Sequence, residues 1–377
     1  MIVGIDVSSV AYGTGVSNYT LNLVKHLVKN DRKNTYKLFF SSLRQPLPVN
    51  IRLLKKFSNV RVYHYRLPPT FLEILWNRIH FLPIEIFIGD CDIFHTSDWT
   101  QPPTIKAKTI ATIHDLTPFL NPQWLPPVIV KAHRRKMFWA VQKCYAFVCV
   151  SQNTKNDLTR LFPLIKQPVY VIPEAAEDKY GRYRKLSKKI KLQKQQILQK
   201  QYGLTRYVLA QGTREPRKNL DRLIQAFIKF RQKYPKSKTE LAISGKYGWG
   251  QDVLVRPQSY IKVLGYIPEK DMAALHANAL CLAYPSLYEG FGLPLVKSME
   301  VGVPVITSNV SSLPEVVGSA GILVDPLSVE NIEIAIEKIV TSLSLRTKLS
   351  KLSLKQAQKF SWDRTAIETL AVYKSLL

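Results

Sequence analysis

Short apolar runs alternate with amphipathic stretches along nearly the whole chain. In the first half, the apolar runs lie at 2–6, 36–41, 60–65, 93–95, 109–113, 146–151 and 169–172. Helical spacing of apolar residues follows the first run, over 16–29, and further helices are expected at 71–81 and 127–143. Continuous buried strands that alternate with helices predict a parallel, doubly wound sheet.

The second half repeats this pattern. Strands are expected at 207–211, 240–244, 261–264, 279–283, 304–307 and 321–324, with helices near 220–233, 269–277, 293–301 and 329–342. At 377 residues the chain is too long for one ordinary core. We therefore expect an α/β protein with two Rossmann-like domains that face a central cleft, with ligands at the carboxyl ends of the strands.

The expected boundaries follow from these elements. The first Rossmann-like domain takes 1–173, a basic linker and helix take 174–203, and the second Rossmann-like domain takes 204–358. A last helix within 359–377 is expected to pack back toward the first domain.

Composition indicates a folded protein of the cytoplasm. Apolar residues make up 46% of the chain, and no stretch has the roughly 18 uninterrupted apolar residues of a membrane span. The start of the chain lacks the basic-then-apolar order of a signal peptide. The four cysteines show no metal-ligand spacing and are expected to be reduced core residues.

Positive charge is concentrated in the first half. The net charge is +27, and residues 1–200 contain 31 Lys and Arg against 12 Asp and Glu. Such a field attracts nucleic acid, an acidic membrane face or a phosphorylated acceptor, and charge alone does not choose among them. Residues 179–201 hold nine Lys and Arg and no acid, which indicates either a solvated helix or an anion-binding patch.

The run 284–306 contains the most specific chemistry. Glu289 stands directly before Gly290-Phe291-Gly292, and a helix is expected to begin near Leu293 and Pro294. Free amides and the positive dipole end at such a helix start favour an anion, and the glycines allow close approach to the backbone. A carboxylate beside this turn suits a sugar phosphate.

Seven blocks in register resemble the retaining nucleotide-sugar glycosyltransferases of the GT-B fold, glycosyltransferase family 4. They are Gly13–Tyr19, Thr112–Leu116, Gly212–Asn219, Gly245–Trp249, Gly265–Ile267, Tyr284–Ile306 and Ser308–Glu315. The chain looks most like the mannosyl- and related hexosyltransferases of bacterial surface polysaccharide assembly.

This resemblance implies roles for particular residues. Lys218 and Arg217 match the basic pair that neutralises the donor diphosphate, and Glu289 matches an acid that contacts the transferred sugar. The amides of Gly290, Phe291, Gly292 and Leu293 are expected to cradle phosphate.

Other matched positions have less direct roles. The backbone at Tyr266 and Ile267 matches a loop that reads the nucleobase, and His114 matches a residue near the reacting carbon. Gly13 and Gly15 are expected to line the cleft. Arg214 lies in the diphosphate loop, where the family often has an apolar residue.

Position 297 departs from the family pattern. Eight residues after Glu289 the family has a second glutamate that accepts hydrogen bonds from both ribose hydroxyls, and here the residue is Lys297. An ammonium group has donors only. Lys297 could contact phosphate or a hydroxyl oxygen, Glu300 could substitute for the glutamate or pair with Lys297, or donor binding has been lost.

The reaction implied by the resemblance moves a hexose, with mannose as the guess, from a nucleotide diphosphate sugar to a hydroxyl with retention of configuration. The resemblance implies that no cofactor or metal is needed, and the chain has no Asp-x-Asp in a plausible loop. A GT-B epimerase or phosphorylase is the alternative enzyme. A nucleic-acid-binding protein is the other class, and no recognised binding module supports it.

The acceptor is expected to be a glycan or a lipid-linked glycan. The cluster over 131–136 lies on a helix that also carries Val128, Ile129, Met137, Phe138 and Trp139. It is either a site for peripheral docking on an anionic membrane or an ordinary surface helix with its apolar face in the core.

Overall fold

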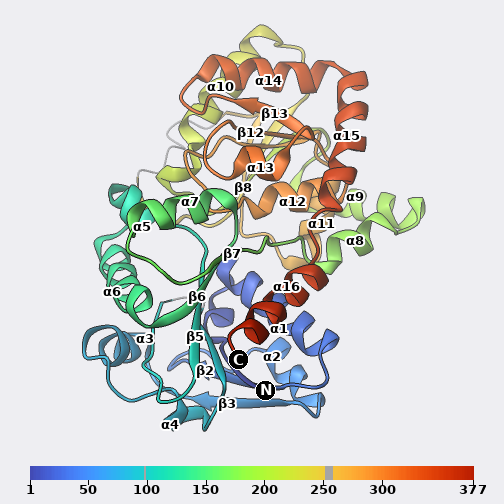
Figure 1. Ribbon diagram of the computed structural model, residues 1–377. Helices are drawn as coiled ribbons and strands as arrows, with labels where there is room; N and C mark the ends of the chain where they lie inside the picture. The colour runs from blue at the N-terminus through green and yellow to red at the C-terminus, as the bar shows by residue number, and fades with distance from the viewer. Residues whose placement is uncertain (97–98, 251–257) are drawn as a thin grey trace. The chain divides into compact units, whose positions relative to one another are not determined.

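The computed structural model describes residues 1–96, 99–250 and 258–377, and the chain forms two compact units (Figure 1). The first contains Met1–Glu174 together with Ser361–Leu377, and the second contains Ala175–Phe360. The chain therefore leaves the first unit after Glu174 and returns to it for the last helix.

The first unit is built on a seven-stranded sheet in which all neighbouring strands are parallel. The strand order is β3-β2-β1-β4-β5-β6-β7. The strands are β1 Ile2–Asp6, β2 Thr35–Ser41, β3 Val60–Tyr65, β4 Ile93–Thr96, β5 Lys108–Ile113, β6 Cys144–Cys149 and β7 Val169–Val171. This order confirms the predicted doubly wound, parallel architecture of the first half.

Helices cover this sheet and bury its apolar side chains. They are η1 Ser8–Tyr12, α1 Gly15–Asn30, α2 Val49–Arg52, η2 Leu53–Lys56, α3 Pro69–Leu72, η3 Glu73–Arg78, α4 Glu85–Ile88, α5 Thr117–Leu120, η4 Pro122–Trp124, α6 Pro127–Lys143, α7 Gln152–Leu161 and α16 Trp362–Ser375. One core cluster centres on Trp76 and Phe94, and another on Met137 and Phe147.

The helix predicted over 71–81 is shorter and irregular. α3 ends at Leu72 and continues as the π-helix η3, which ends at Arg78. His80 and Leu82 have φ values of 55° and 59°, and a left-handed backbone cannot continue a right-handed helix. The buried Trp76 indole donates a hydrogen bond to the Leu82 carbonyl (2.9 Å), which fixes the reversal.

The C-terminal helix α16 lies beside α1 in the first unit (Figure 1). Its Tyr373 hydroxyl is 2.6 Å from His95 Nδ1, and the other ring nitrogen of His95 is 2.7 Å from Thr112 Oγ1. A buried polar chain therefore joins α16 to β4 and β5.

The second unit contains a six-stranded parallel sheet with the order β10-β9-β8-β11-β12-β13. The strands are β8 Tyr207–Gln211, β9 Glu240–Ser244, β10 Ile261–Gly265, β11 Cys281–Tyr284, β12 Val305–Ser308 and β13 Gly321–Val324. This sheet confirms the second predicted Rossmann-like domain.

The helices of the second unit begin with the basic segment that follows the first sheet. They are α8 Asp178–Arg184, α9 Lys188–Tyr202, η5 Pro216–Lys218, α10 Leu220–Lys233, α11 Glu269–Ala277, α12 Leu293–Glu300, α13 Leu313–Val317, α14 Val329–Thr341 and α15 Leu343–Ala357. α10 and α14 lie side by side (Figure 1), where Phe227 and Ile336 are fully buried.

All four cysteines are free and buried, as the sequence predicted. Burial raises the pKa of Cys91, Cys144, Cys149 and Cys281 to about 12, so these thiols are unreactive at neutral pH. Within the described residues, we find no helix with the length and apolarity that crossing a bilayer demands.

Candidate functional site

The carboxyl edge of the second sheet gathers most of the predicted site. Strand order reverses at β8, which has β9 on one side and β11 on the other, and ligands of open α/β sheets bind at such a switch point. A small cavity opens there, lined by Gln211 at the end of β8, Gly212 just after it, Ser244 at the end of β9, Tyr284 at the end of β11, and Lys218.

Gly212 and Gly245 allow the loops after β8 and β9 to approach each other closely. A β-carbon on Gly245 would lie 1.8 Å from the carbonyl oxygen of Gly212, closer than any non-bonded contact allows. The loops are then joined by hydrogen bonds from the Arg214 amide to the Lys246 carbonyl (2.9 Å) and from the Gly248 amide to the Arg214 carbonyl (3.1 Å). Arg214 is therefore fixed by its backbone, and its guanidinium lies over the Tyr247 ring at 5.6 Å.

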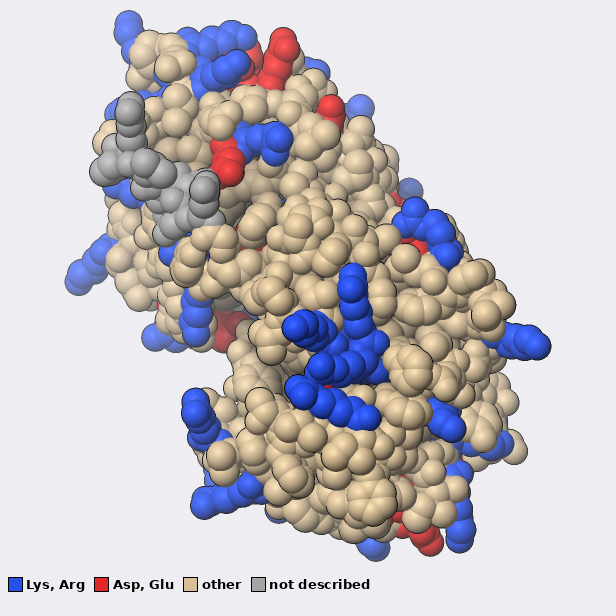
Figure 2. All heavy atoms as spheres, turned by 90° about the vertical axis from the view of Figure 1, so that its left-hand side faces the viewer, with Lys and Arg blue, Asp and Glu red and all other residues tan. Residues whose placement is uncertain are grey.

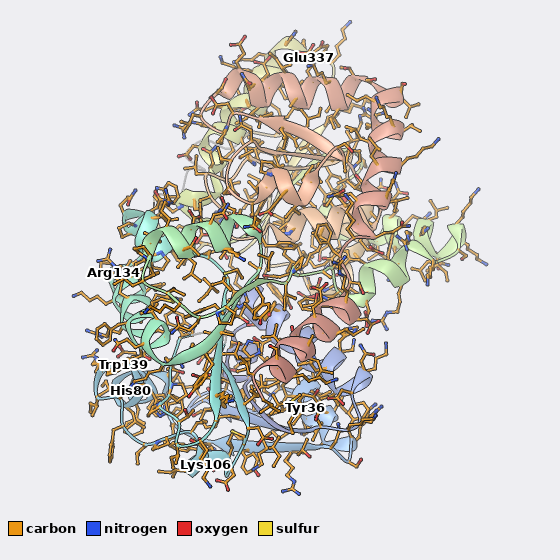
Figure 3. The ribbon with its side chains drawn as sticks, viewed as in Figure 1. Tyr36, His80, Lys106, Arg134, Trp139 and Glu337 are labelled. Carbon is orange, nitrogen blue, oxygen red and sulfur yellow. The ribbon has the colours of Figure 1, made fainter. Side chains whose placement is uncertain are left out.

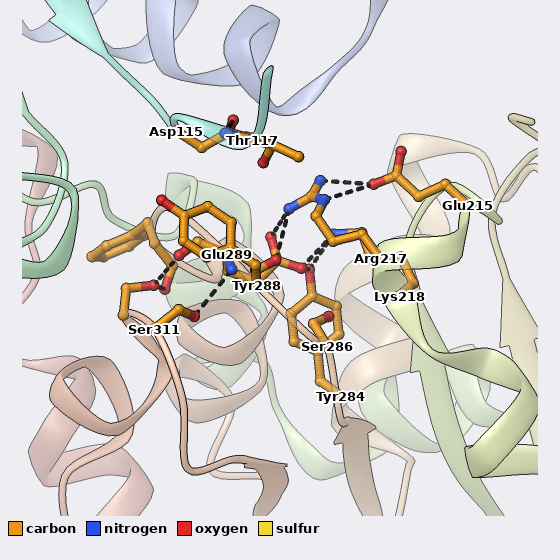
Figure 4. A network of polar contacts seen from close by, with 12 residues as sticks. Asp115, Thr117, Glu215, Arg217, Lys218, Tyr284, Ser286, Tyr288, Glu289 and Ser311 are labelled. Carbon is orange, nitrogen blue, oxygen red and sulfur yellow. Dashed lines mark hydrogen bonds and ion pairs between the residues drawn. The ribbon is translucent and has the colours of Figure 1, made fainter. Parts of the chain in front are cut away.

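Glu289, Arg217 and Lys218 form one ionic cluster, in which Glu289 is buried and the two cations are largely buried (Figure 4). Lys218 Nζ is 2.6 Å from Glu289 Oε1, and Arg217 Nη1 is 2.6 Å from Glu289 Oε2. Three residues that the sequence assigned to donor binding thus meet, although they come from different loops. In this structure the carboxylate and the cations satisfy one another.

Tyr284 and Glu215 complete this cluster, and sequence reasoning missed both. The Tyr284 hydroxyl accepts a hydrogen bond from Lys218 Nζ (2.6 Å) and donates one to Glu289 Oε1 (2.7 Å). Glu215 Oε1 accepts two hydrogen bonds from the Arg217 guanidinium, at 3.1 and 2.7 Å. A tyrosine that ends a buried strand was a usable signal, because a buried hydroxyl needs a partner.

The cluster shifts the acidities of its members. Burial opposes the charge of Glu289, but Arg217, Lys218 and their hydrogen bonds outweigh burial and lower its pKa to about 2. Burial, followed by repulsion from Arg217, lowers the pKa of Lys218 despite its contact with Glu289. The site therefore holds cations away from water, where an incoming anion binds more strongly than at the surface.

The predicted glycine turn precedes α12 as expected. Gly292 has a φ of 100° and caps the helix, which starts at Leu293 with Pro294 in its first turn. Ser311 accepts a hydrogen bond from the Glu289 amide (3.0 Å), and the Ser312 hydroxyl lies within 3.0 Å of the Glu289 and Phe291 carbonyls. These serines fix the turn that carries Glu289.

Lys297 is buried and forms an ion pair that the sequence did not predict. Its Nζ lies 3.0 Å from Glu177 Oε1. Glu300 instead pairs with Arg184, at 3.1 Å. The suggested pairing of Lys297 with Glu300 is therefore wrong, because each side chain contacts a different residue in or just before α8.

The loop that was predicted to read the nucleobase follows β10. Tyr266 is 61% exposed while Ile267 is buried, so the tyrosine ring remains open to stacking. Lys246 Nζ lies over this ring at 4.9 Å. The role of the loop stays a prediction.

Three predicted residues lie in the first unit. His114 directly follows β5, with Nδ1 3.5 Å from Glu174 Oε1 and its ring edge-on to Tyr19. Gly13 and Gly15 lie exposed around the start of α1, and a β-carbon on either meets nothing within 4 Å. Their predicted contacts with the donor stay predictions.

The basic cluster on α6 is divided between surface and core. Lys131 and Arg134 are exposed, but Lys136 is only 4% exposed, so it does not belong to the surface patch. Burial raises the pKa of Asp6, and Lys136 opposes that rise from the interior. Sequence reasoning counted Lys136 with its neighbours because lysines are rarely buried.

The exposed face of α6 also carries apolar side chains. Val128 is 73% exposed and Phe138 57%. The rings of Trp139 and His80 are stacked at 3.8 Å, which places the η3 segment beside α6 (Figure 3). The face of the molecule on the α6 side of Figure 1 shows Lys and Arg gathered among uncharged atoms (Figure 2).

Known proteins match over both halves of the chain. The model described as Glycosyltransferase Family 4 matches residues 13–178, and the model described as Glycosyl transferases group 1 matches residues 193–356. The O-antigen chain mannosyltransferase B of Escherichia coli is 32% identical over 383 residues, which cover 96% of each chain. The chain belongs to glycosyltransferase family 4.

More distant relatives of this glycosyltransferase agree. The O-antigen chain mannosyltransferase RfbU of Salmonella typhimurium is 26% identical and covers 68% of this chain and 67% of its own. Among solved structures, the Thermosynechococcus elongatus sucrose-phosphate synthase has a TM-score of 0.73 at 16% identity and covers 100% of this chain and 99% of its own. HepE of Anabaena, solved with UDP and glucose, has a TM-score of 0.70 at 14% identity with full coverage of both chains. The solved structures show the GT-B fold.

The described part of this glycosyltransferase contains no group of three or more His, Cys, Asp or Glu side chains placed to hold a metal ion. The positive groups found at the switch point are Arg217 and Lys218.

Proposed function

We propose that this glycosyltransferase moves a hexose, with mannose as the first candidate, from a nucleotide diphosphate sugar to a glycan or lipid-linked acceptor, with retention of configuration and without a metal. The observation that carries the proposal is the buried cluster of Glu289, Arg217 and Lys218 at the strand-order reversal of the second sheet. The two O-antigen mannosyltransferases among its relatives support mannose and a glycan acceptor.

The cations are proposed to bind the diphosphate. Lys218 has three N–H donors, and two of them serve Tyr284 and Glu289. The third can reach a phosphate oxygen, and the negative charge that develops on the leaving diphosphate strengthens this contact as the glycosidic bond breaks. The amides at the start of α12 would add their dipoles.

Glu289 is proposed to orient the sugar. Its low pKa keeps it ionised throughout the physiological range, so it acts as a hydrogen-bond acceptor rather than a general acid. A sugar hydroxyl would share the carboxylate with Arg217 and Lys218. The acceptor is proposed to attack from the face that the diphosphate leaves, with a phosphate oxygen taking the acceptor proton.

A donor screen with product analysis tests the reaction. The protein is incubated in EDTA with GDP-mannose and other nucleotide hexoses and a mannose-terminated acceptor, and NMR assigns the anomeric configuration of the product. An α-linked product from an α-linked donor supports the proposal. An inverted product would refute retention, and activity that requires added Mg²⁺ or Mn²⁺ would refute metal independence.

The exposed face of α6 is proposed to bring the acceptor side to an anionic membrane. Lys131 and Arg134 supply charge, and Val128 and Phe138 supply exposed apolar surface on the same helix. Sedimentation with phosphatidylglycerol vesicles should be lost in Lys131→Glu/Arg134→Glu. The matched control is Lys188→Glu/Lys189→Glu on the exposed start of α9. Equal binding to neutral phosphatidylcholine vesicles would refute the electrostatic docking.

A further inference from the structure

A buried carboxylate lies where the family pattern lacks one. Glu177 precedes α8, and its side chain is 11% exposed. Its Oε1 is 3.0 Å from Lys297 Nζ and 3.5 Å from Lys179 Nζ. Lys297 occupies the position at which the family has its second glutamate. Its ammonium group pairs with the carboxylate of Glu177, so a carboxylate lies at the end of the lysine side chain.

This carboxylate has an acceptor to spare. Both carboxylate oxygens of Glu177 are buried and accept no hydrogen bond from the described residues, and the two lysines form their ion pairs with Oε1. Burial opposes its charge, but Lys297 and Lys179 outweigh burial and lower the pKa of Glu177, so it is ionised at neutral pH. A buried carboxylate oxygen without a donor is costly unless a ligand or water supplies one.

The surroundings of Glu177 contain further polar atoms without partners. The hydroxyl of Tyr180 and Nε2 of His276 are both buried and have no hydrogen-bond partner among the described residues. The two rings meet edge to face at 5.4 Å, and Lys297 Nζ lies 5.7 Å from the Tyr180 ring centre. The ion pair between Glu177 and Lys297 therefore lies among other buried polar groups that lack hydrogen-bond partners. A purely structural ion pair does not require such groups around it.

The position of this group relates it to the donor. Lys297 follows Leu293, the first residue of α12, by four positions, so the two side chains lie on the same helix face. The proposed phosphate-binding turn therefore lies one helical turn from Lys297. A carboxylate held at the tip of the Lys297 side chain suits the sugar of the nucleotide, whose adjacent hydroxyls supply two O–H donors.

We propose that Glu177 is the residue that accepts hydrogen bonds from the ribose hydroxyls of the nucleotide donor, and that Lys297 is the positioning residue that holds it. The inference rests on the proposed use of a nucleotide sugar. It replaces the explanations in which Lys297 itself contacts the donor, Glu300 substitutes for the family glutamate, or donor binding has been lost.

The chain provides a matched control for a purely structural ion pair. Arg184 and Glu300 join α8 to α12 at 3.1 Å, as Glu177 and Lys297 join the segment before α8 to the same helix. Glu300→Gln therefore removes a neighbouring cross-helix ion pair without touching the proposed ribose contact.

The experiment measures selectivity for ribose. Calorimetry gives the affinity of GDP, UDP and ADP, each against its 2′-deoxy counterpart, for the wild type, Glu177→Gln, Lys297→Gln and Glu300→Gln. The wild type should bind the preferred ribonucleotide about tenfold or more tightly than the deoxy form, as expected for a hydrogen bond to a charged group. Glu177→Gln should lose this preference, Lys297→Gln should reduce it, and Glu300→Gln should keep it.

The exchanged pair Glu177→Lys/Lys297→Glu adds a rescue. It places a glutamate at the family position and should restore the ribose preference, which a general loss of folding could not do. If the wild type binds none of the three diphosphates, the proposed function falls and this inference with it. If the wild type binds one of them but Glu177→Gln keeps the full ribose preference, only the inference is overturned.

Discussion

Glu289→Gln keeps the shape of the side chain and removes its charge from the cluster with Arg217 and Lys218. Both cations are then left in a buried site where Glu215 is the remaining carboxylate that contacts Arg217. We expect the variant to be folded but clearly less stable at neutral pH.

The magnitude follows from the pKa of Glu289, which falls from 4.5 to about 2 on folding. That difference corresponds to roughly 3 kcal/mol of stability at pH 7. It agrees with the 3–5 kcal/mol that breaking a buried ion pair typically costs, to within about 1 kcal/mol. Since the folded pKa is the lower one, this stability is present above about pH 4.5 and is lost as the pH falls toward 2. At pH 3 roughly half of it should remain.

Unfolding in urea is measured at pH 7 and at pH 3, with hydrogen exchange of peptides from β8, β11 and α12 as the readout. The difference in unfolding free energy between the wild type and Glu289→Gln should be smaller at pH 3 than at pH 7. Glu337→Gln is the control, because its pair with Lys233 lies on the surface of the same unit and should change protection little. If Glu289→Gln lost the same amount of unfolding free energy at both pH values, the electrostatic origin of this loss would be refuted.

Three further predictions concern the two units. Burial lowers the pKa of His95 to about 3, so the first unit should lose stability as the pH falls from 6.5 toward 3. This loss should appear as faster hydrogen exchange in α16, which His95 contacts through Tyr373, and unchanged exchange there would contradict a neutral His95. Gly245→Ala should unfold the second unit or prevent its expression, because the new β-carbon would meet the Gly212 carbonyl, while Gly15→Ala should leave the melting temperature nearly unchanged. A stable Gly245→Ala protein would show that the two loops do not approach each other as closely as described. Ser312→Ala should cost about 1–3 kcal/mol by urea unfolding, because the one hydroxyl proton that the Glu289 and Phe291 carbonyl oxygens share is lost, and a loss below about 0.5 kcal/mol would contradict that.

The fold was predictable because local signals and global topology agree. Each apolar run became a strand of one of the two parallel sheets, and Pro294 after a glycine turn located the start of α12. The exception was the helix near Trp76, whose end depends on left-handed residues. His80 and Leu82 adopt that conformation because tertiary contacts hold them there, and no local pattern announces it.

The site was predictable only where the motifs were contiguous. Arg217, Lys218 and Glu289 each lie in a recognisable block, and the structure brings them together. Glu177 lies outside the family blocks and far from Lys297 in the sequence, so only the fold could pair them. Lys136 was assigned to the surface because its burial depends on packing that a charge count does not include.

The central claim is that fixed positive groups hold the donor diphosphate. Its most direct test is the affinity of GDP against GMP, and of UDP against UMP, measured in EDTA for the wild type, Lys218→Met and the surface control Lys188→Met. We expect the wild type to prefer a diphosphate over its monophosphate by about tenfold or more, roughly the contribution of one charged hydrogen bond, and only Lys218→Met to lose this preference. Equal affinity for the two phosphates in the wild type, or an unchanged preference in Lys218→Met, would contradict it.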